Sequence, residues 1–340
     1  MTTTPKIAAQ ACTKTSADLR HLRIAHTRIR ELKNEVQSLI YPESQNSILL
    51  VVGPTGVGKT TLCKHLVEEQ FKKHKEQMES DANVIPAIYI QAPASGEQEF
   101  SWRMFYERIL EQLEGNELGL NKHAFGINES TEMLVRPKRQ GKSTLAGLRT
   151  AVERALRQRG TQLLVIDEAA HIIRQTSRNN LCVQLDTLKS LANECGTQIV
   201  LVGSYDLYNL VSLSAQLARR THVLHFERYR QDRPEDINAF TKCLKQFEAQ
   251  IPHLWKDQLT PHVEALMENT LGCIGTLSGI LTLAARYAEA SGGWSIDALK
   301  RVLMTQAQVN QILEEIADGE SAIDPSMTRT MPTLGQRKRA

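Results

Sequence analysis

The stretch ILLVVGPTGVGKTTL, residues 48–62, decides the fold class of this chain. It joins a continuous apolar run, typical of a buried strand, to a glycine-rich turn and then to a helix-forming segment. Glycines let the backbone curl so that successive N–H groups point at an anion, and the following helix turns its N-terminus toward the same point. The spacing fits the GxxxxGK[ST] loop, so we expect it to hold nucleotide phosphates.

Each polar residue of this P-loop has an expected role. Lys59 is expected to bridge the β- and γ-phosphates, and the Thr60 hydroxyl to ligate Mg²⁺. The whole phosphate-binding set is Gly53, Pro54, Thr55, Gly56, Val57, Gly58, Lys59, Thr60 and Thr61.

A second part of the site follows the apolar run LLVI at residues 163–166. Asp167 at the end of this predicted strand is expected to hold the Mg²⁺ shell. The next residue, Glu168, is placed to activate a water for attack on the γ-phosphate. The chain contains no NKxD guanine-reading element, so ATP is expected rather than GTP.

Three further residues are weaker candidates. Ser204 ends the run QIVLVGS and is either a polar sensor of the γ-phosphate or a serine that begins a turn. Arg219 and Arg220 precede the last predicted strand and either reach the γ-phosphate of an adjacent subunit or form a solvated basic helix end.

Strand and helix patterns alternate through the first two thirds of the chain, which favours a parallel sheet covered on both faces. Predicted strands are 47–52, 84–90, 162–166, 198–202 and 222–226, separated by predicted helices 60–75, 100–113, 144–159 and 181–194. A single helix is predicted from Asp18 to Ile40, and helices 234–250, 260–270, 276–290 and 295–317 follow. We therefore expect a disordered N-terminus (1–17), an α/β core with its N-terminal helix (18–230), a helical lid (231–317) and a flexible basic tail (318–340).

Composition excludes several classes of protein. Apolar residues make up 41% and the formal net charge is +3, as in an ordinary globular protein. The six cysteines have no metal-binding spacing and indicate free thiols in a reducing compartment. No signal peptide or membrane-spanning run is present, so we expect a cytoplasmic protein without a membrane partner.

One segment is strongly basic. Residues 136–159 contain eight basic residues against one acidic residue, a net of +7. Such a patch can neutralise DNA phosphates without reading bases, and we expect Lys138, Arg139 and Lys142 to contact duplex DNA. The other interpretation is that residues 149–159 are a solvated helix face.

Together the P-loop, the Asp167–Glu168 pair, the Ser204 strand end, the paired arginines and the helical lid resemble an AAA+ ATPase. The resemblance implies a sheet ordered 5-1-4-3-2, a nucleotide at the junction of core and lid, and oligomers completed by arginines in trans. The segment Leu271–Gly279 resembles the start of the lid helix that carries a sensor arginine in many AAA+ proteins. Its first arginine is Arg286, so slow turnover is expected.

Within AAA+ proteins the sequence most resembles the TnsC/TniB/MuB transposition regulators. The resemblance rests on the basic helix at 19–40, on ILLVVGPTGVGKTTL, LLVIDEAAHI and LVGS, and on QLARR before the last strand. It implies a homo-oligomer that forms filaments on target duplex DNA with ATP, recruits or activates a DDE transposase, works with a target-selector protein, and disassembles on hydrolysis.

Three alternatives remain. A replication initiator or helicase loader shares the core, but initiators usually carry a DNA-binding domain after the lid, and none is predicted here. A membrane-linked ATPase would need a membrane span. A nucleotide-gated scaffold would bind ATP and hardly hydrolyse it, which the intact Glu168 argues against.

Overall fold

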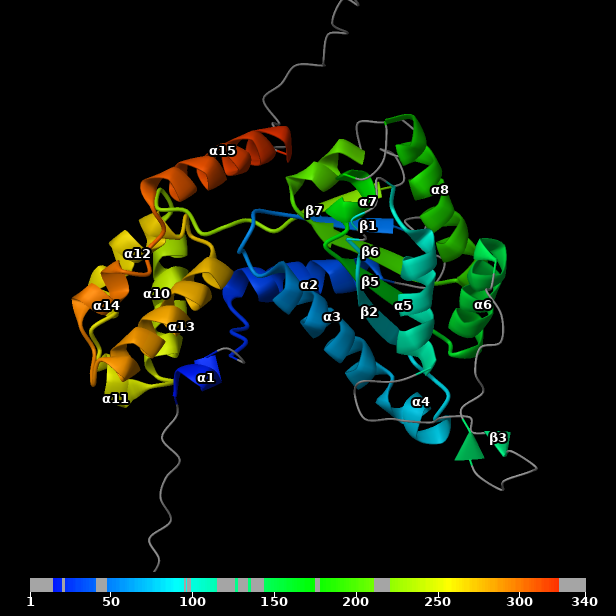
Figure 1. Ribbon diagram of the computed structural model, residues 1–340, viewed down its shortest axis with the longest axis horizontal. Helices are drawn as coiled ribbons and strands as arrows, with labels where there is room; N and C mark the ends of the chain where they lie inside the picture. Colours follow the sequence, from blue (N-terminus) through cyan, green and yellow to red (C-terminus); the bar gives the residue numbers. More distant parts are fainter. Residues whose placement is uncertain are drawn as a thin grey trace, which may run out of the picture.

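A five-stranded parallel sheet forms the centre of the larger part of the molecule (Figure 1). The computed structural model describes residues 15–19, 22–40, 48–94, 96, 99–114, 126–127, 134–135, 144–174, 178–210 and 221–323. The strands are β1 (Ile48–Val52), β2 (Ala87–Gln91), β5 (Leu163–Asp167), β6 (Gln198–Gly203) and β7 (Thr221–His225), all parallel and in the order β2-β5-β6-β1-β7. Read from the other edge this is the order 5-1-4-3-2, so the predicted fold class is confirmed.

Helices cover both faces of the sheet because the side chains of each strand alternate between two apolar clusters. In β1, Leu49 and Val51 pack in one cluster with α2 and α3, whereas Leu50 and Val52 pack in the other with α5, α6 and α8. All residues of β1 are buried, which explains its continuous apolar run. These helices are α2 (Thr27–Leu39), α3 (Lys59–Lys73), α5 (Trp102–Glu114), α6 (Leu145–Gln158) and α8 (Arg178–Cys195).

A second hydrophobic core lies in a helical bundle after the sheet, on the left of Figure 1. Its largest buried side chains include Trp255, Phe240 and Phe247. The bundle contains α10 (Pro234–Glu248), α11 (Pro252–Trp255), η2 (Thr260–His262), α12 (Val263–Asn269), α13 (Ile274–Ala290) and α14 (Ile296–Lys300). We call this bundle the lid. The division into a core at residues 18–230 and a lid at residues 231–317 stays a prediction.

The single helix predicted from Asp18 to Ile40 is wrong. The chain forms α1 (Ser16–Leu19) and α2, with residues 22–26 in non-helical conformation between them. Leu19 and Ile24 are buried in the lid cluster, whereas Leu32 and Val36 of α2 are buried against the sheet. A straight helix cannot bury its apolar side chains in two separate bodies, so the chain changes conformation where it passes from lid to core.

The predicted helix 295–317 is also two elements, α14 and α15 (Gln306–Ile323), and the predicted flexible tail begins too early. Residues 318–323 continue α15 because Gly319 lies against the ring of Tyr205 and Glu320 pairs with Arg228 at 2.8 Å. Helix α15 thereby reaches from the lid back to the core (Figure 1). Residues 1–14 and 324–340 lie outside the described residues.

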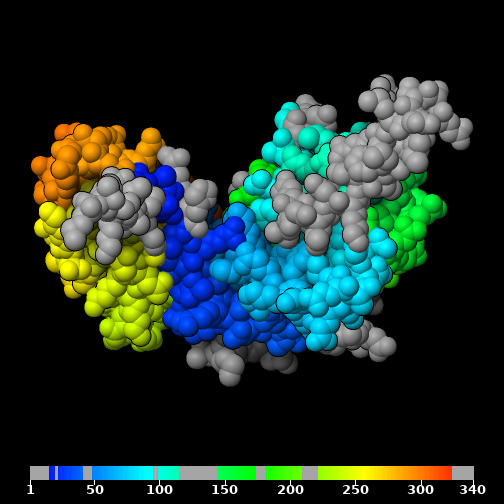
Figure 2. Space-filling view, turned by 90° about the horizontal axis from the view of Figure 1, so that it is seen from below, coloured from blue at the N-terminus to red at the C-terminus, as the bar shows by residue number. Residues whose placement is uncertain are grey.

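Smaller elements complete the part of the chain that is described. They are α4 (Lys75–Ser80), the antiparallel pair β3 (Gly126–Ile127) and β4 (Leu134–Val135), α7 (Ala170–Arg174) and η1 (Tyr205–Leu210). Figure 2 shows a notch between lid and core, with the N-terminal segment in blue between them. No single described helix is long and apolar enough to cross a membrane; Thr260–Asn269 and Ile274–Ala290 pass that test only as a pair bent by 120°.

Candidate nucleotide site

The P-loop begins where β1 ends and leads into α3. Gly56 and Gly58 have φ angles of 79° and 116°, a region that residues with a side chain rarely adopt. Position 53 requires glycine for a different reason: a Cβ at Gly53 would lie only 2.5 Å from the Phe226 carbonyl oxygen. The loop therefore holds the curled shape predicted for it, with the N-terminus of α3 directed at its centre.

Lys59 is folded back onto its own loop. Its Nζ donates hydrogen bonds to the carbonyl oxygens of Gly53 at 2.9 Å and Pro54 at 2.7 Å. Burial lowers the pKa of Lys59, and the nearby carboxylates of Glu168 and Asp167 oppose that shift. A buried ammonium of this kind gains most from an anion in the loop, as expected for a phosphate ligand.

Asp167 and Thr60 meet at the base of the loop. Asp167 is fully buried, and its Oδ2 accepts a hydrogen bond from the Thr60 hydroxyl at 2.7 Å. The Tyr89 hydroxyl donates to the same Oδ2 at 3.1 Å. Tyr89 was not predicted as part of the site, because only the pairing of β2 with β5 brings it beside Asp167. Burial raises the pKa of Tyr89, and the negative charge of Asp167 raises it further. The Tyr89 hydroxyl therefore stays protonated and can donate.

Glu168 has a left-handed backbone with φ of 52°, which is unusual for a residue with a side chain. Its N–H donates to Asp167 Oδ1 at 2.9 Å, which helps to hold this conformation. Glu168 lines a cavity of about 400 Å³ together with Lys59, Thr60 and Ser204. The structure thus brings together the predicted base, the P-loop and the predicted sensor.

Ser204 enters this cavity from the end of β6. Its hydroxyl donates to Asp206 Oδ2 at 3.2 Å within η1. The next residue, Tyr205, bonds His225 through its hydroxyl at 3.0 Å and supports α15. The sensor role of Ser204 stays a prediction, since the turn that the other interpretation requires is also present.

The lid contacts the P-loop directly. The N–H of Thr276 in the first turn of α13 donates to the Gly56 carbonyl oxygen at 3.1 Å. A Cβ on Gly275 would lie 2.6 Å from that same oxygen, so only glycine permits this approach. Arg286 is exposed and far along α13 from this contact. Phosphates bound in the P-loop would therefore lie close to the backbone of Gly275 and Thr276 in the lid.

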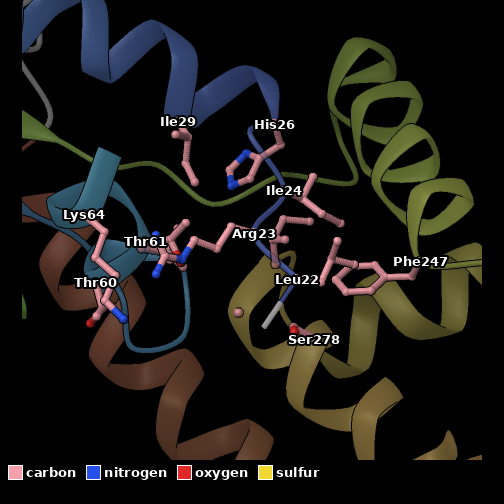
Figure 3. Close-up of a pocket in the computed structure, with 14 residues that line it drawn as sticks. Leu22, Arg23, Ile24, His26, Ile29, Thr60, Thr61, Lys64, Phe247 and Ser278 are labelled. Carbon is pink, nitrogen blue, oxygen red and sulfur yellow. The ribbon is translucent and has the colours of Figure 1, made fainter. Parts of the chain in front are cut away.

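A second cavity, of about 510 Å³, adjoins the loop at the junction of lid and core (Figure 3). Its lining is half apolar and half polar side chains, and three parts of the chain contribute: the segment 22–29, the P-loop with the start of α3, and the lid. Its lining is Leu22, Arg23, Ile24, His26, Ile29, Val57, Gly58, Thr60, Thr61, Lys64, Phe247, Ile274, Gly275 and Ser278. Its size is within the range of small-ligand sites, and its lining offers both apolar surface and polar groups. Residues 22–26 were predicted as part of a continuous helix and not as part of the site, and they line this cavity in a non-helical conformation.

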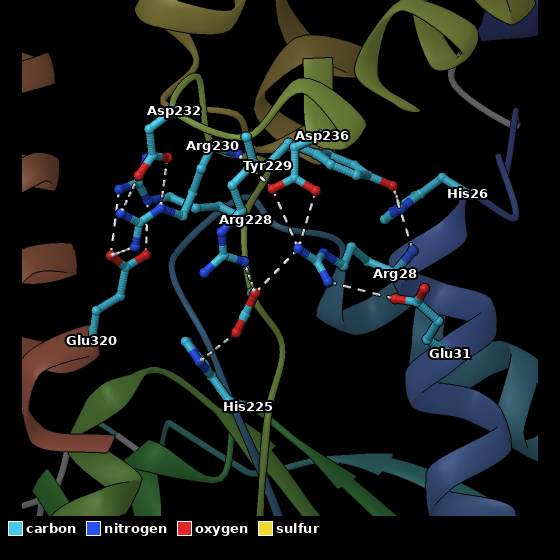
Figure 4. Close-up of polar contacts among 12 residues, drawn as sticks. His26, Arg28, Glu31, His225, Arg228, Tyr229, Arg230, Asp232, Asp236 and Glu320 are labelled. Atoms are coloured by element: carbon cyan, nitrogen blue, oxygen red, sulfur yellow. Dashed lines mark hydrogen bonds and ion pairs between the residues drawn. The ribbon is translucent and has the colours of Figure 1, made fainter. Parts of the chain in front are cut away.

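Ion pairs connect the N-terminal segment to the lid next to this cavity (Figure 4). Arg28 on α2 lies 3.1 Å from Asp236 on α10 and 3.2 Å from Glu227 in the connection between core and lid. Asp236 is 4% exposed and also accepts the Arg230 N–H at 3.0 Å. A carboxylate so buried needs these partners, so Arg28 fixes the position of the segment that lines the cavity.

The residues present fit a magnesium nucleotide. The glycine cradle and Lys59 would hold the phosphates, and Thr60 with Asp167 would hold the metal shell. The larger cavity beside them, with its mixed apolar and polar lining, would take a purine ring. Bound Mg²⁺ would neutralise charge on the phosphates, and Glu168 lines the same cavity.

The predicted arginines and DNA contacts lie outside the described residues: Arg219, Arg220, Lys138, Arg139 and Lys142. The adjoining helix α6 is described. There Arg149 bonds Glu153 at 2.8 Å and Ser190 at 2.7 Å, so this basic side chain is used within the fold. Arg149 is thus a partly buried structural side chain, whereas the alternative interpretation predicts a solvated one.

Residues 42–211, half of the chain, match the family described as AAA domain. The chain belongs to the AAA domain family. Membership implies nucleotide hydrolysis in general terms, and the match covers the P-loop, Asp167, Glu168 and Ser204. A search of curated proteins found no match.

Two solved structures with TM-scores of 0.50 or more share the fold of this AAA domain protein, and a third is similar at a lower score. The ORC2 protein of Aeropyrum pernix, in ADPNP and ADP complexes, is 17% identical with a TM-score of 0.51, over 83% of this chain and 68% of that one. Cdc6p of Pyrobaculum aerophilum is 15% identical with a TM-score of 0.50, over 85% and 71%. Domain III of the Thermotoga maritima replication initiation protein DnaA is 13% identical with a TM-score of 0.44, over 88% and 95%.

Proposed function

We propose that this AAA domain protein is an ATP-dependent regulator of DNA transposition. With ATP it oligomerises on target duplex DNA, as helical filaments, and recruits or activates a DDE transposase; hydrolysis drives disassembly. The observation that carries the ATP switch is the phosphate cavity, which Glu168 and Ser204 line from the core and Gly275 lines from the lid.

A ligand shifts a conformational equilibrium only by as much as it binds one state better than another. Nucleotide in this cavity would touch both bodies at once, because the lid is bonded to the P-loop through Thr276 and Gly56. ATP binding would therefore favour one arrangement of lid and core, and loss of the γ-phosphate would weaken that preference. Such a change can control assembly with neighbouring subunits.

The chemistry assigned to the site follows from the same geometry. Glu168 acts as general base toward water, Lys59 neutralises the phosphates, and Thr60 and Asp167 hold Mg²⁺. Arg219 or Arg220 of an adjacent subunit supplies positive charge to the transition state. Without an arginine at the start of α13, we expect slow turnover that depends on DNA or a partner.

DNA binding is assigned to the basic segment before α6, through Lys138, Arg139 and Lys142. Contacts to phosphates alone give affinity without sequence choice, which suits a protein that marks target DNA. The transposase and target-selector partners follow from the resemblance to TnsC/TniB/MuB proteins.

The test is negative-stain imaging of the purified protein with duplex DNA, with and without a non-hydrolysable ATP analogue. We expect helical assemblies on DNA only when the nucleotide is present. Monomers under both conditions would contradict the filament proposal.

The second candidate function is a replication initiator or helicase loader, and the fold shared with ORC2 and Cdc6p keeps it open. The two candidates differ in what the assembled protein stimulates. Enhanced strand transfer by a DDE transposase on protein-coated DNA would support the first. Helicase loading without such enhancement would support the second.

A further inference from the structure

The imidazole of His26 places an unpaired buried nitrogen at the wall of the larger cavity. His26 is 4% exposed, and its Nε2 has no hydrogen-bond partner in the part of the chain that the structure describes. Figure 3 shows the ring turned toward the cavity, between Ile29 and Ile24. A buried polar atom without a partner destabilises a fold, and this one lies at the wall of a cavity where a ligand could pair with it.

The neighbours of His26 determine which nitrogen carries the proton. Its Nδ1 lies 2.9 Å from the Tyr229 hydroxyl, and that hydroxyl also accepts the Arg28 N–H at 3.4 Å. Donation from Tyr229 to Nδ1 gives the hydroxyl proton an acceptor, and we assign His26 the tautomer that accepts there. Burial lowers the pKa of His26 to about 4, so the ring is neutral at physiological pH. A neutral ring that accepts at Nδ1 carries its proton on Nε2.

We propose that Nε2–H of His26 donates a hydrogen bond to a ring nitrogen of the purine base, and that Tyr229 is the positioning residue that holds this tautomer. The inference rests on the nucleotide binding proposed above and adds a recognition contact to it. It identifies the larger cavity as the base site and the smaller one as the phosphate site.

The chemistry favours the base over the phosphates as the partner of His26. The cavity also contains Arg23 and Lys64, but the immediate neighbours of the His26 ring in Figure 3 are Ile24 and Ile29. A neutral donor beside apolar side chains matches an uncharged acceptor on a flat ring. Adenine has such acceptors at N1, N3 and N7, whereas its exocyclic amino group is a donor and cannot pair with Nε2–H. The phosphates have their own partners in Lys59 and the backbone of the loop.

Position also supports the base. A Cβ placed on Gly58 would lie 3.9 Å from His26 Nε2, so the nitrogen stands beside the phosphate loop without entering it. A base linked through ribose to phosphates in that loop would lie within reach of this donor.

His65 provides a matched control. Its Nε2 is also buried without a partner among the described residues, but His65 does not line the cavity and its side chain is 21% exposed. Replacing His65 thus changes a histidine on α3 near the site without changing the wall of the base cavity.

The experiment measures equilibrium binding of ATP, tripolyphosphate and the 1-deaza, 3-deaza and 7-deaza analogues of ATP by calorimetry. The proteins are the wild type, His26→Ala, Tyr229→Phe and His65→Gln, each first checked for native circular dichroism. We expect His26→Ala to weaken ATP binding about 3- to 10-fold, the loss of one neutral hydrogen bond. Tripolyphosphate affinity should not change, and His65→Gln should bind ATP like the wild type.

The analogues identify the bond itself. One deaza analogue should bind the wild type more weakly than ATP does, and His26→Ala should bind that analogue and ATP equally. Tyr229→Phe should lose part of the same difference, since the tautomer is no longer held. Equal ATP affinity in wild type and His26→Ala would overturn the inference alone, as would an equal loss for tripolyphosphate. Failure of the wild type to bind ATP at all would overturn the proposed function with it.

Discussion

Lys59 illustrates how single residues prepare the site for an anion. Its ammonium is bonded to two carbonyl oxygens of the loop that would face the phosphates, and burial lowers its pKa. Glu168 is prepared differently, since its backbone is held in a left-handed conformation by the bond from its N–H to Asp167. Substitutions at Lys59 and Glu168 that leave the backbone unchanged can therefore distinguish nucleotide binding from hydrolysis.

We expect Lys59→Ala to lose ATP binding, because the buried positive charge that would pair with the phosphates is gone. Glu168→Gln should keep ATP binding and assembly but lower turnover about 10²- to 10⁴-fold, the usual contribution of a general base. Calorimetry and a phosphate-release assay measure the two effects, with Lys73→Ala, an exposed position at the end of α3, as control. Normal hydrolysis by Glu168→Gln would show that another group activates the water.

His26 makes the stability of the fold depend on pH. Burial, and then the charges of Arg28, Arg30 and His65, lowers its pKa to about 4, against about 6.5 in an unfolded chain. As pH falls from 6.5 toward 4, the unfolded state takes up a proton before the folded state does. Folding stability contributed by neutral His26 is therefore present above pH 6.5 and is lost as pH falls, by about 3 kcal/mol at most.

Urea denaturation between pH 7 and pH 5 measures this dependence. His26→Gln cannot take up the proton, so its free energy of unfolding should fall less steeply with decreasing pH than that of the wild type. His253→Gln, at an exposed position of the lid, should keep the wild-type slope. Identical slopes for His26→Gln and the wild type would contradict the assignment of a low pKa to His26.

At the scale of elements, the first turn of α13 is the contact that joins lid to P-loop. Two glycines on this helix have opposite surroundings. A Cβ on Gly275 would lie 2.6 Å from the Gly56 carbonyl oxygen, whereas a Cβ on Gly279 would have no atom within 4 Å. They form a natural pair for testing the contact, because both substitutions to alanine favour helix formation equally.

We expect Gly275→Ala to move α13 away from the loop, to cost about 1–3 kcal/mol in stability and to weaken ATP binding. Gly279→Ala should leave ATP affinity unchanged and stabilise the helix by up to about 1 kcal/mol. Thermal unfolding and calorimetry distinguish the two. If both variants bind ATP alike, the contact between α13 and Gly56 has no part in nucleotide binding.

At the scale of the whole molecule, the N-terminal segment, the sheet and the lid meet around one junction, and α15 returns from the lid to the core at η1. Arg28 and Arg228 provide ion pairs across this junction, to Asp236 and Glu320. The proposed DNA surface is the basic segment before α6.

Reversing Lys138, Arg139 and Lys142 together to glutamate should abolish duplex DNA binding while ATP binding persists. If each of the three contacts a phosphate, replacing any one of them by alanine should lower the log–log salt slope by about 1. The control reverses Lys73, Lys242 and Lys245, which are exposed and give the same change in net charge. Fluorescence anisotropy measures both, and unchanged DNA affinity of the first variant would move the DNA surface elsewhere.

The sequence by itself determined those features of this protein that are formed by residues close to one another in the chain. The P-loop spacing, the apolar strands and the position of Asp167 and Glu168 at a strand end are local patterns, and the AAA domain family and sheet order agree with them. Only the tertiary structure decided which distant segments meet. Tyr89 reaches Asp167 through strand pairing, His26 enters a cavity because its segment leaves the helix between two hydrophobic cores, and α15 continues past residue 317 because Tyr205 and Arg228 support it. The periodicity of apolar residues indicates which side chains are buried. Contacts between segments distant in the sequence decide which part of the protein those side chains pack against.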